Sequence, residues 1–261
     1  MPTWRVSLDH KFDNDILTYV SYNRGYKSGG YIATSPATPA YKPEYLDAYE
    51  IGEKSQWLNN RLRINAAAFL YNYKDIQVNS LVGSVGIIYN GAKAREYGLD
   101  IDTDFRITDD FSLIGSAVWN HDRFTSFPNA VIARPLANGL VSNTLGSAEG
   151  NELPFAPTGS ASLGFDYKFH LASAGTTDLV LNDLYSTGFY GQVDNYLRQP
   201  GYHMLNGSLN WKPLNGNFNV MLWANNMLNR NVATYLQAAT AQQIVQYQPP
   251  RTFGVRLGVQ F

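Results

Sequence analysis

Hydrophobic and polar residues alternate strictly along the C-terminal segment of the chain. The apolar residues of this segment occupy every second position, at Phe253, Val255, Leu257, Val259 and Phe261. The side chains of a β-strand point to opposite faces with a period of two, so the segment is predicted to be a strand with one apolar and one polar face. Such a strand suits a soluble antiparallel sheet, and it equally suits a membrane barrel whose exterior faces lipid.

Similar segments, separated by residues typical of turns, recur throughout the chain. They predict eleven strands, near residues 3–12, 15–26, 45–58, 61–78, 91–107, 111–127, 157–169, 178–192, 201–213, 217–230 and 251–261. The short connectors are Asp13-Asn14, Asn59-Asn60, Thr108–Asp110, Ala172–Thr177 and Asn215-Gly216. They alternate with long connectors at 27–44, 79–90, 128–156, 193–200 and 231–250. This alternation predicts an antiparallel up-and-down meander with tight turns at one end, as in outer-membrane barrels, whereas a Greek-key sandwich has no reason to sort its loops by length.

Ionisable residues gather on the polar faces of several predicted strands. Asp100, Asp102 and Asp104 share one face of their strand, while Leu99 and Ile101 share the other. A dry core does not tolerate unpaired carboxylates, so these aspartates are expected to line a water-filled lumen in preference to a cation site.

Aromatic residues stand beside two of the short connectors. Trp57 precedes Asn59-Asn60, and Trp211 precedes Asn215-Gly216. Aromatic side chains are enriched where a membrane barrel meets the interface. We therefore expect both tryptophans in an interfacial girdle.

Three residues break the alternation. Glu53 shares the apolar face of its strand with Ile51, and Asp183 shares an apolar face with Leu181, whereas Leu184 falls among polar neighbours. Either a β-bulge shifts the register at these places or the predicted strand limits are displaced.

The composition excludes several classes of protein. The formal net charge of −1 gives no electrostatic footprint for nucleic acid. The absence of cysteine excludes disulfides, thiolate metal sites and cysteine nucleophiles. The longest apolar run, Ala66–Tyr71, is far shorter than the roughly 18 residues of a membrane helix. Residues 1–20 contain no signal peptide, so for an exported protein the natural N-terminus is expected to be missing.

Residues that could carry chemistry are scattered. The histidines lie at positions 10, 121, 170 and 203 without metal-binding spacing, and no nucleophile elbow or phosphate-binding loop is present. We therefore expect neither enzymatic activity nor a cofactor. Five cations at the long connectors are candidates for binding an anionic ligand, although ordinary solvated loop residues are the favoured interpretation: Arg24, Lys27, Lys42, Arg134 and Arg198.

Several segments resemble consecutive sequence blocks of one known family, the TonB-dependent receptors of Gram-negative outer membranes. These segments are Tyr19–Gly30, Lys42–Lys54, Phe69–Gln77, Gly91–Asp100, Asn225–Arg230 and Pro250–Gly254 together with the terminal strand. Lys42–Lys54 follows the family's Pro-Glu…Tyr-Glu-x-Gly-x-Lys pattern, although Glu53 stands where the family usually has an apolar residue. The block order is preserved over essentially the whole chain.

The resemblance implies an all-β transmembrane barrel of about 22 strands, plugged by an N-terminal domain and located in the cell outer membrane. Residues 1–261 are expected to be the C-terminal portion of that barrel, a partial barrel without the plug or the first half. The family imports a scarce ligand, of the siderophore-iron, cobalamin or carbohydrate class, with energy from the TonB complex. Expected partners are outer-membrane lipid, the TonB complex through the absent plug, and the barrel-assembly machinery, for which Phe253, Val255, Leu257, Val259 and Phe261 form a C-terminal signal.

Two alternatives remain open from the sequence. One is a passive porin-like barrel, which would have the same two-faced strands. The other is a secreted soluble β-sandwich that binds glycans. The residues do not identify the ligand.

Overall fold

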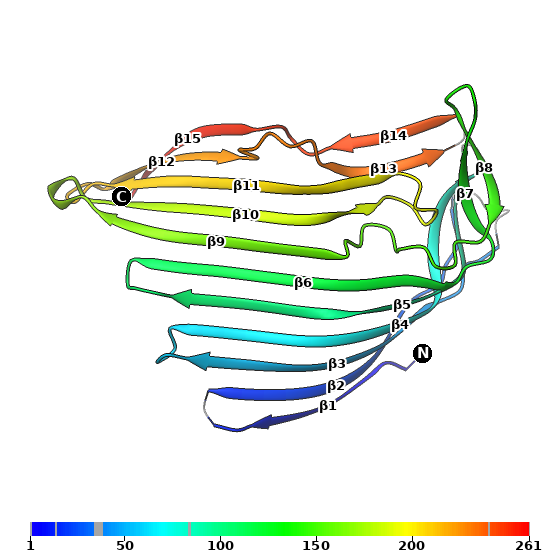
Figure 1. Ribbon diagram of the computed structural model, residues 1–261, viewed down its shortest axis with the longest axis horizontal. Coiled ribbons are helices and arrows are strands. Elements are labelled where there is room, and N and C mark those ends of the chain that lie inside the picture. Colours follow the sequence, from blue (N-terminus) through cyan, green and yellow to red (C-terminus); the bar gives the residue numbers. More distant parts are fainter. Residues whose placement is uncertain (1, 14, 34–38, 83–84, 240, 261) are drawn as a thin grey trace.

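The computed structural model describes residues 2–13, 15–33, 39–82, 85–239 and 241–260. Eleven strands form one sheet (Figure 1). Their bounds are β1 Trp4–Lys11, β2 Ile16–Lys27, β3 Glu44–Trp57, β4 Leu62–Val82, β5 Val85–Arg106, β6 Phe111–Ser126, β9 Gly159–His170, β10 Thr176–Tyr190, β11 Arg198–Lys212, β12 Phe218–Asn225 and β15 Thr252–Val259. Two separate hairpins consist of β7 Ala130–Pro135 with β8 Val141–Gly146, and β13 Ala233–Ala239 with β14 Gln242–Tyr247. A short 3-10 turn, η1, covers Ala172–Ala174.

The sheet is an antiparallel meander, as the sequence predicts. Each strand pairs with the next sheet strand along the chain, and the β7–β8 and β13–β14 hairpins are inserted into the connections from β6 to β9 and from β12 to β15. Both hairpins lie at one end of the sheet, on the right of Figure 1, and the short connections lie at the other. The predicted separation of short turns from long connections is therefore confirmed for the described residues. Asn14, in one predicted short turn, lies outside them.

Some predicted connectors are wrong in detail. The segment 79–90 is not a loop, because β4 and β5 remain paired as far as Val82↔Val85; residues 83–84 lie outside the described residues. β-Branched residues such as Val78, Ile87 and Ile88 favour strand here, and the interspersed Gly, Ser and Asn obscured that preference. The connectors 128–156 and 231–250 each contain a hairpin. Residues 34–38 and 240, in two other predicted loop regions, lie outside the described part.

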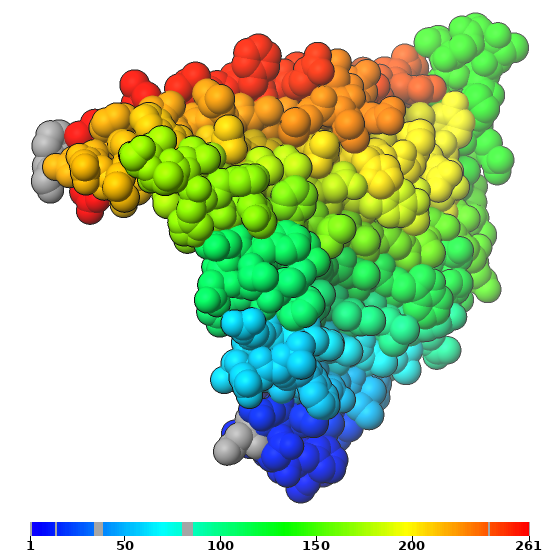
Figure 2. All heavy atoms as spheres, turned by 60° about the vertical axis from the view of Figure 1, so that its left-hand side comes forward, coloured from blue at the N-terminus to red at the C-terminus, as the bar shows by residue number. Residues whose placement is uncertain are grey.

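The sheet is curved and open. In Figure 2 the chain rises from the first strands (blue) at the bottom to the last (red) at the top, and the upper strands project to the left over the middle ones. Among the described residues, β1 and β15 each pair on one side only. Since an antiparallel meander of eleven strands has parallel outer strands, these two edges cannot pair with each other in the antiparallel manner of a barrel.

Buried apolar residues gather at the long-connection end. The larger cluster joins the ends of β4, β5 and β6 to the loops that follow, and consists of Val78, Ala92, Ala94, Phe124, Phe127, Ala130, Ala148 and Val193. The paired strands themselves expose large apolar side chains along most of their length. Within the described residues, no helix is long and apolar enough to cross a membrane.

Candidate functional site: an outward apolar belt and a loop cavity

The terminal strand carries its apolar side chains on one exposed face. Phe253, Val255, Leu257 and Val259 are 62–79% exposed. In the register of β15 with β12, Val255 stands opposite Leu222, so the apolar faces of the two strands coincide. Continuing the registers across the sheet places all the apolar strand faces on the same side, which we call the outward face. Phe261, the last residue of the predicted assembly signal, lies outside the described residues.

Aromatic side chains border the outward face at both ends, and in four strands the two borders are eight residues apart. The pairs are Trp4 and Phe12, Tyr49 and Trp57, Tyr97 and Phe105, and Trp119 and Phe111. Neighbouring aromatics contact one another along the borders. The rings of Tyr22 and Tyr49 stack with centroids 4.9 Å apart on the long-connection side, and those of Trp211 and Phe218 meet edge to face at 5.8 Å on the short-turn side.

The spacing of the two aromatic borders matches the apolar band of a membrane barrel. Eight residues of strand extend over roughly 27 Å, and a strand tilt of about 40° reduces this to roughly 21 Å along the membrane normal. Outer-membrane barrels have apolar bands of about 25 Å, flanked by aromatic girdles. Trp57 and Trp211 both lie in the short-turn border, as the sequence predicts, and the indole Nε1 of Trp211 donates to the Ala174 carbonyl oxygen at 2.8 Å.

The residues that break the alternation are not explained by bulges. The pairing of β3 with β2 and β4 runs without a register shift through Glu53, which therefore points outward beside Ile51. β10 is likewise regular at Asp183, which points outward and contacts His203, with its Oδ2 2.7 Å from Nδ1 of the imidazole. Leu184 lies on the inward face. The predicted strand faces were correct, and two acidic residues stand on the apolar face.

The inward face carries ionisable side chains, as the sequence predicts. Asp100, Asp102 and Asp104 all lie on this face of β5. Asp102 accepts a hydrogen bond from the Asn65 amide at 2.8 Å, and Asp104 lies 3.7 Å from the Arg63 guanidinium. Asp102 and Asp104 therefore each have a polar partner on a neighbouring strand.

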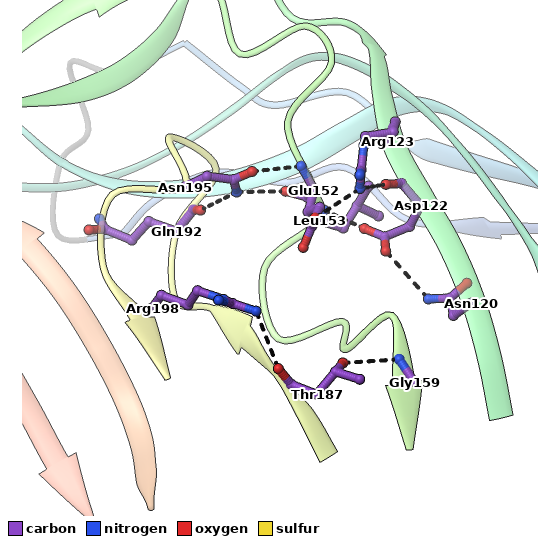
Figure 3. A network of polar contacts seen from close by, with 10 residues as sticks. All are labelled: Asn120, Asp122, Arg123, Glu152, Leu153, Gly159, Thr187, Gln192, Asn195 and Arg198. Carbon is purple, nitrogen blue, oxygen red and sulfur yellow. Dashed lines mark hydrogen bonds and ion pairs between the residues drawn. The ribbon is translucent and has the colours of Figure 1, made fainter. Parts of the chain in front are cut away.

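At the long-connection end, side chains fasten separate loops to one another (Figure 3). The side chain of Asn195 binds the backbone of Glu152 twice: its Oδ1 accepts from the Glu152 N–H at 2.7 Å, and its Nδ2 donates to the carbonyl oxygen at 3.0 Å. Asn195 adopts a positive φ of 53°, which asparagine tolerates better than most residues. The carboxylate of Glu152 also pairs with Arg123 of β6 at 3.3 Å. Three segments distant in sequence are thereby held together.

Side chains of residues 192–199 also form hydrogen bonds with the backbone of both inserted hairpins. Asp194 accepts a hydrogen bond from the Ala133 N–H of β7 at 2.9 Å. Gln192 accepts one from the Ala238 N–H of β13, and Gln199 accepts one from the Ala233 N–H at 2.8 Å. The hairpins are thus bonded to the connection between β10 and β11 and to the start of β11.

Asp122 is the most buried ionisable residue of this network. It lies on β6 beyond the aromatic border at Trp119, has no exposed surface, and accepts a hydrogen bond from the Leu153 N–H. Burial raises the pKa of its carboxyl above the usual range of aspartate, and the neighbouring Glu152 carboxylate adds to the rise. The hydrogen bond from the Leu153 N–H and the charge of the Arg123 guanidinium both lower the pKa and so reduce the rise.

A cavity of about 370 Å³ opens between these loops. Its lining contains no Asp, Glu, Lys or Arg and combines apolar residues with amide side chains: Ile76, Gln77, Val78, Asn79, Phe124, Val131, Leu153, Pro154, Phe155, Gly191, Gln192, Val193, Tyr235, Leu236 and Gln237. Phe124 belongs to the inward face of β6, so the cavity lies on the same side of the sheet as Asp100, Asp102 and Asp104. Such a lining suits an uncharged, partly aromatic ligand surface.

The five loop cations singled out from the sequence do not line this cavity. Arg24 points outward, 3.3 Å from Asp47. Arg198 donates to the Thr187 carbonyl oxygen at 3.3 Å, and Arg134 is an exposed residue of β7. Lys27 and Lys42 lie near each other, because the Gln77 side-chain amide donates to both of their carbonyl oxygens, at 3.4 and 3.1 Å. Among the described residues, no group of three histidine or acidic side chains is arranged to hold a metal ion.

Comparisons with known proteins agree with this architecture. A family model described as "TonB dependent receptor-like, beta-barrel" matches residues 1–227. The pesticin receptor of Yersinia pestis is 22% identical over 260 residues, covering 98% of this chain and 36% of that protein.

Solved structures show the same fold. The ferric yersiniabactin uptake receptor FyuA from Yersinia pestis has a TM-score of 0.80 at 22% identity, with 98% of this chain and 37% of that chain covered. The siderophore receptor PiuA from Acinetobacter baumannii has a TM-score of 0.75 at 21% identity, with coverage of 98% and 35%. The chain thus spans little more than a third of the length of these relatives.

Proposed function

Because the chain belongs to the TonB-dependent receptor β-barrel family, we propose that it forms part of the barrel wall and of the ligand-facing loops of an outer-membrane uptake receptor. The observation that carries this proposal is the outward apolar belt between two aromatic borders. A soluble monomer rarely exposes an apolar patch above a few hundred Å², whereas lipid covers such a belt in a barrel.

The remaining wall would come from other parts of the receptor. The relatives are almost three times as long as this chain, and the open edges of β1 and β15 offer unpaired backbone groups, which lipid does not satisfy. We propose that further barrel strands pair with both edges and that a plug domain connects the receptor to the TonB complex. The apolar face of β15, together with Phe261, would serve as the signal for the barrel-assembly machinery.

The ligand that fits best is a ferric siderophore. FyuA is described as a ferric yersiniabactin uptake receptor and PiuA as a siderophore receptor, which favours this class over cobalamin or carbohydrate. The cavity lining without charges suits an apolar, aromatic part of such a chelate. The chain would bind and position ligand without covalent chemistry.

Uptake by the full-length receptor tests this proposal. Cells that produce the receptor should accumulate a radioactive ferric siderophore only when TonB is functional. Accumulation without TonB would indicate a passive porin, and a receptor that fractionates as a soluble monomer without detergent would indicate a secreted sandwich.

The cavity has a matched pair of variants on one hairpin. Tyr235 on β13 lines the cavity, whereas Tyr247 on β14 is 60% exposed and does not. Tyr235→Asp places a charge in the uncharged lining and should lower siderophore affinity at least tenfold, while Tyr247→Asp should leave it unchanged. Equal affinities of the two variants would place the ligand elsewhere.

A further inference from the structure

Directly beyond the aromatic border on the long-connection side, one row of the outward face is rich in cations. The strand registers place Arg24 opposite Asp47, Asp47 opposite Asn72, Asn72 opposite Arg95, and Arg95 opposite Arg123. This row crosses five consecutive strands, from β2 to β6. The next row outward adds Lys74 on β4 and Lys93 on β5.

The positive charges of these two rows are only partly neutralised. Asp47 is shared by Arg24 at 3.3 Å and Lys74 at 3.5 Å, and Glu152 pairs with Arg123. Lys93 and Arg95 form no ion pair among the described residues. Even when Asp75, in the bulge after Lys74, is counted, the cations outnumber the carboxylates by five to three.

Two of the cations are exposed on the outward face. Lys93 and Arg95 lie on alternate positions of β5, both exposed. The Arg95 Nε donates to the Asn72 Oδ1 at 3.1 Å, and among the described residues its terminal guanidinium nitrogens have no partner and can bind an anion. A guanidinium in this orientation suits bidentate binding of a phosphate.

At the opposite end of the sheet, two basic side chains lie beside acidic ones. Beyond the short-turn border, Arg61 lies 3.4 Å from Asp109, and His170 lies 2.8 Å from Asp110. The row of cations from β2 to β6 lies on the long-connection side, which outer-membrane barrels direct outside the cell.

We propose that this cationic patch, Arg24, Lys74, Lys93, Arg95 and Arg123, binds the phosphate groups of a phosphorylated glycolipid in the outer leaflet. The inference rests on the proposed membrane orientation. The patch lies two to four residues beyond the aromatic border, at the level of the headgroups, and basic clusters at that level bind anionic lipid heads. The acyl chains of the same lipid would cover the outward apolar face between the borders.

The test uses the full-length receptor in neutral detergent, with bisphosphorylated lipid A as the probe in native mass spectrometry. Lys93→Gln combined with Arg95→Gln should weaken lipid A binding about 10- to 30-fold, since each surface cation contributes about one tenfold step or less. Lys93→Arg with Arg95→Lys should restore binding.

The matched control removes two cations from the inward face. Lys168→Gln with Arg256→Gln causes the same change in net charge and should bind lipid A as the wild type does. Dephosphorylated lipid A and phosphatidylglycerol should bind all variants weakly and equally. Heat-modifiable mobility in gels verifies that each variant is folded.

Equal lipid A affinities of the patch variant and the inward control would overturn the proposal. So would phosphatidylglycerol binding that follows the patch as closely as lipid A binding does. Siderophore uptake is measured on the same variants. A receptor that binds lipid A through the patch but transports nothing would refute the proposed function alone.

Discussion

The carboxylate of Asp183 and the imidazole of His203 bond across β10 and β11 on the outward face, 2.7 Å apart. The ring of Tyr185 packs against His203 with centroids 4.8 Å apart. A carboxylate near the edge of the apolar belt is costly without a donor, and His203 supplies one. The pair explains how an acidic residue occupies a strand face that otherwise contacts lipid.

The side chains of Asp183 and His203 should contribute jointly, and not independently, to the stability of the barrel. Asp183→Leu or His203→Leu alone leaves one polar partner unsatisfied and should cost about 1–3 kcal/mol. The double variant should lose less than the sum of the two single variants. Denaturant unfolding of the full-length receptor in lipid vesicles measures all three, and additive losses would show that the two side chains are not coupled.

Glu53 is expected to reduce the stability of the wall. It lies outward, four residues from both Tyr49 and Trp57, and forms no hydrogen bond or ion pair among the described residues. Since an acidic side chain at the middle of the belt costs somewhat less than the about 2–4 kcal/mol of Arg or Lys, Glu53→Leu should stabilise the receptor by roughly 1–2 kcal/mol in vesicle unfolding.

Glu50 provides the matched control for that change. It lies on the inward face of the same strand and accepts a hydrogen bond from the Tyr19 hydroxyl at 2.6 Å. Glu50→Leu should destabilise by about 1 kcal/mol. A loss of stability in Glu53→Leu would instead reveal a partner for Glu53 in the assembled receptor.

Arginine substitutions along β15 should be graded by depth. Val255 pairs with Leu222 near the middle of the apolar face, and Leu257 pairs with Val220, nearer the short-turn border. Val255→Arg should cost about 2–4 kcal/mol and Leu257→Arg less, because the penalty falls toward the interface. Surface levels of the full-length receptor measure the effect, and wild-type levels of Val255→Arg would refute the outward assignment. Arg256→Leu, on the inward face, is the control.

Asn195 should hold the ligand-facing loops in place. Asn195→Ala removes both hydrogen bonds to Glu152 and puts alanine at a positive φ, so residues 150–155 should exchange amide hydrogen at least tenfold faster. Siderophore affinity should also fall, because these loop residues line or adjoin the cavity. Asn138→Ala removes only a local bond to the Leu140 N–H at 3.1 Å and should change neither quantity.

The hydrogen bond from the Leu153 N–H to Asp122 holds the loop at residues 150–155 closed against β6. The stability of this closed loop should depend on pH through the Asp122 carboxyl. Its folded pKa is raised, so the closed loop binds the proton more tightly than the open loop does. The stability of the closed loop should therefore fall as the pH rises from about 4, the ordinary pKa of aspartate, through the raised value. Asp122→Asn should abolish that slope in hydrogen exchange of residues 150–155. A slope retained by the variant would assign the titration to another group.

The wall of this protein could be predicted from the sequence, and the loop cavity could not. Period-two alternation set the faces of β5 and β15 correctly, because each face contacts one uniform environment. The eight-residue spacing from Tyr49 to Trp57 is also visible in the sequence. The contacts of Asn195 join residues 43 positions apart, and no local pattern encodes them. The partner of Asp183 likewise follows only from the strand register.

The outward face is tested most directly by spin labels at single cysteines, which are straightforward in this stretch because it contains no native cysteine. Labels replace Leu99, Asp100, Val255 and Arg256 in the full-length receptor in lipid vesicles. The account predicts that labels at Leu99 and Val255 collide with dissolved oxygen and are protected from a water-soluble nickel chelate, whereas labels at Asp100 and Arg256 show the reverse. Equal access of the nickel chelate to all four positions would contradict the membrane-spanning wall.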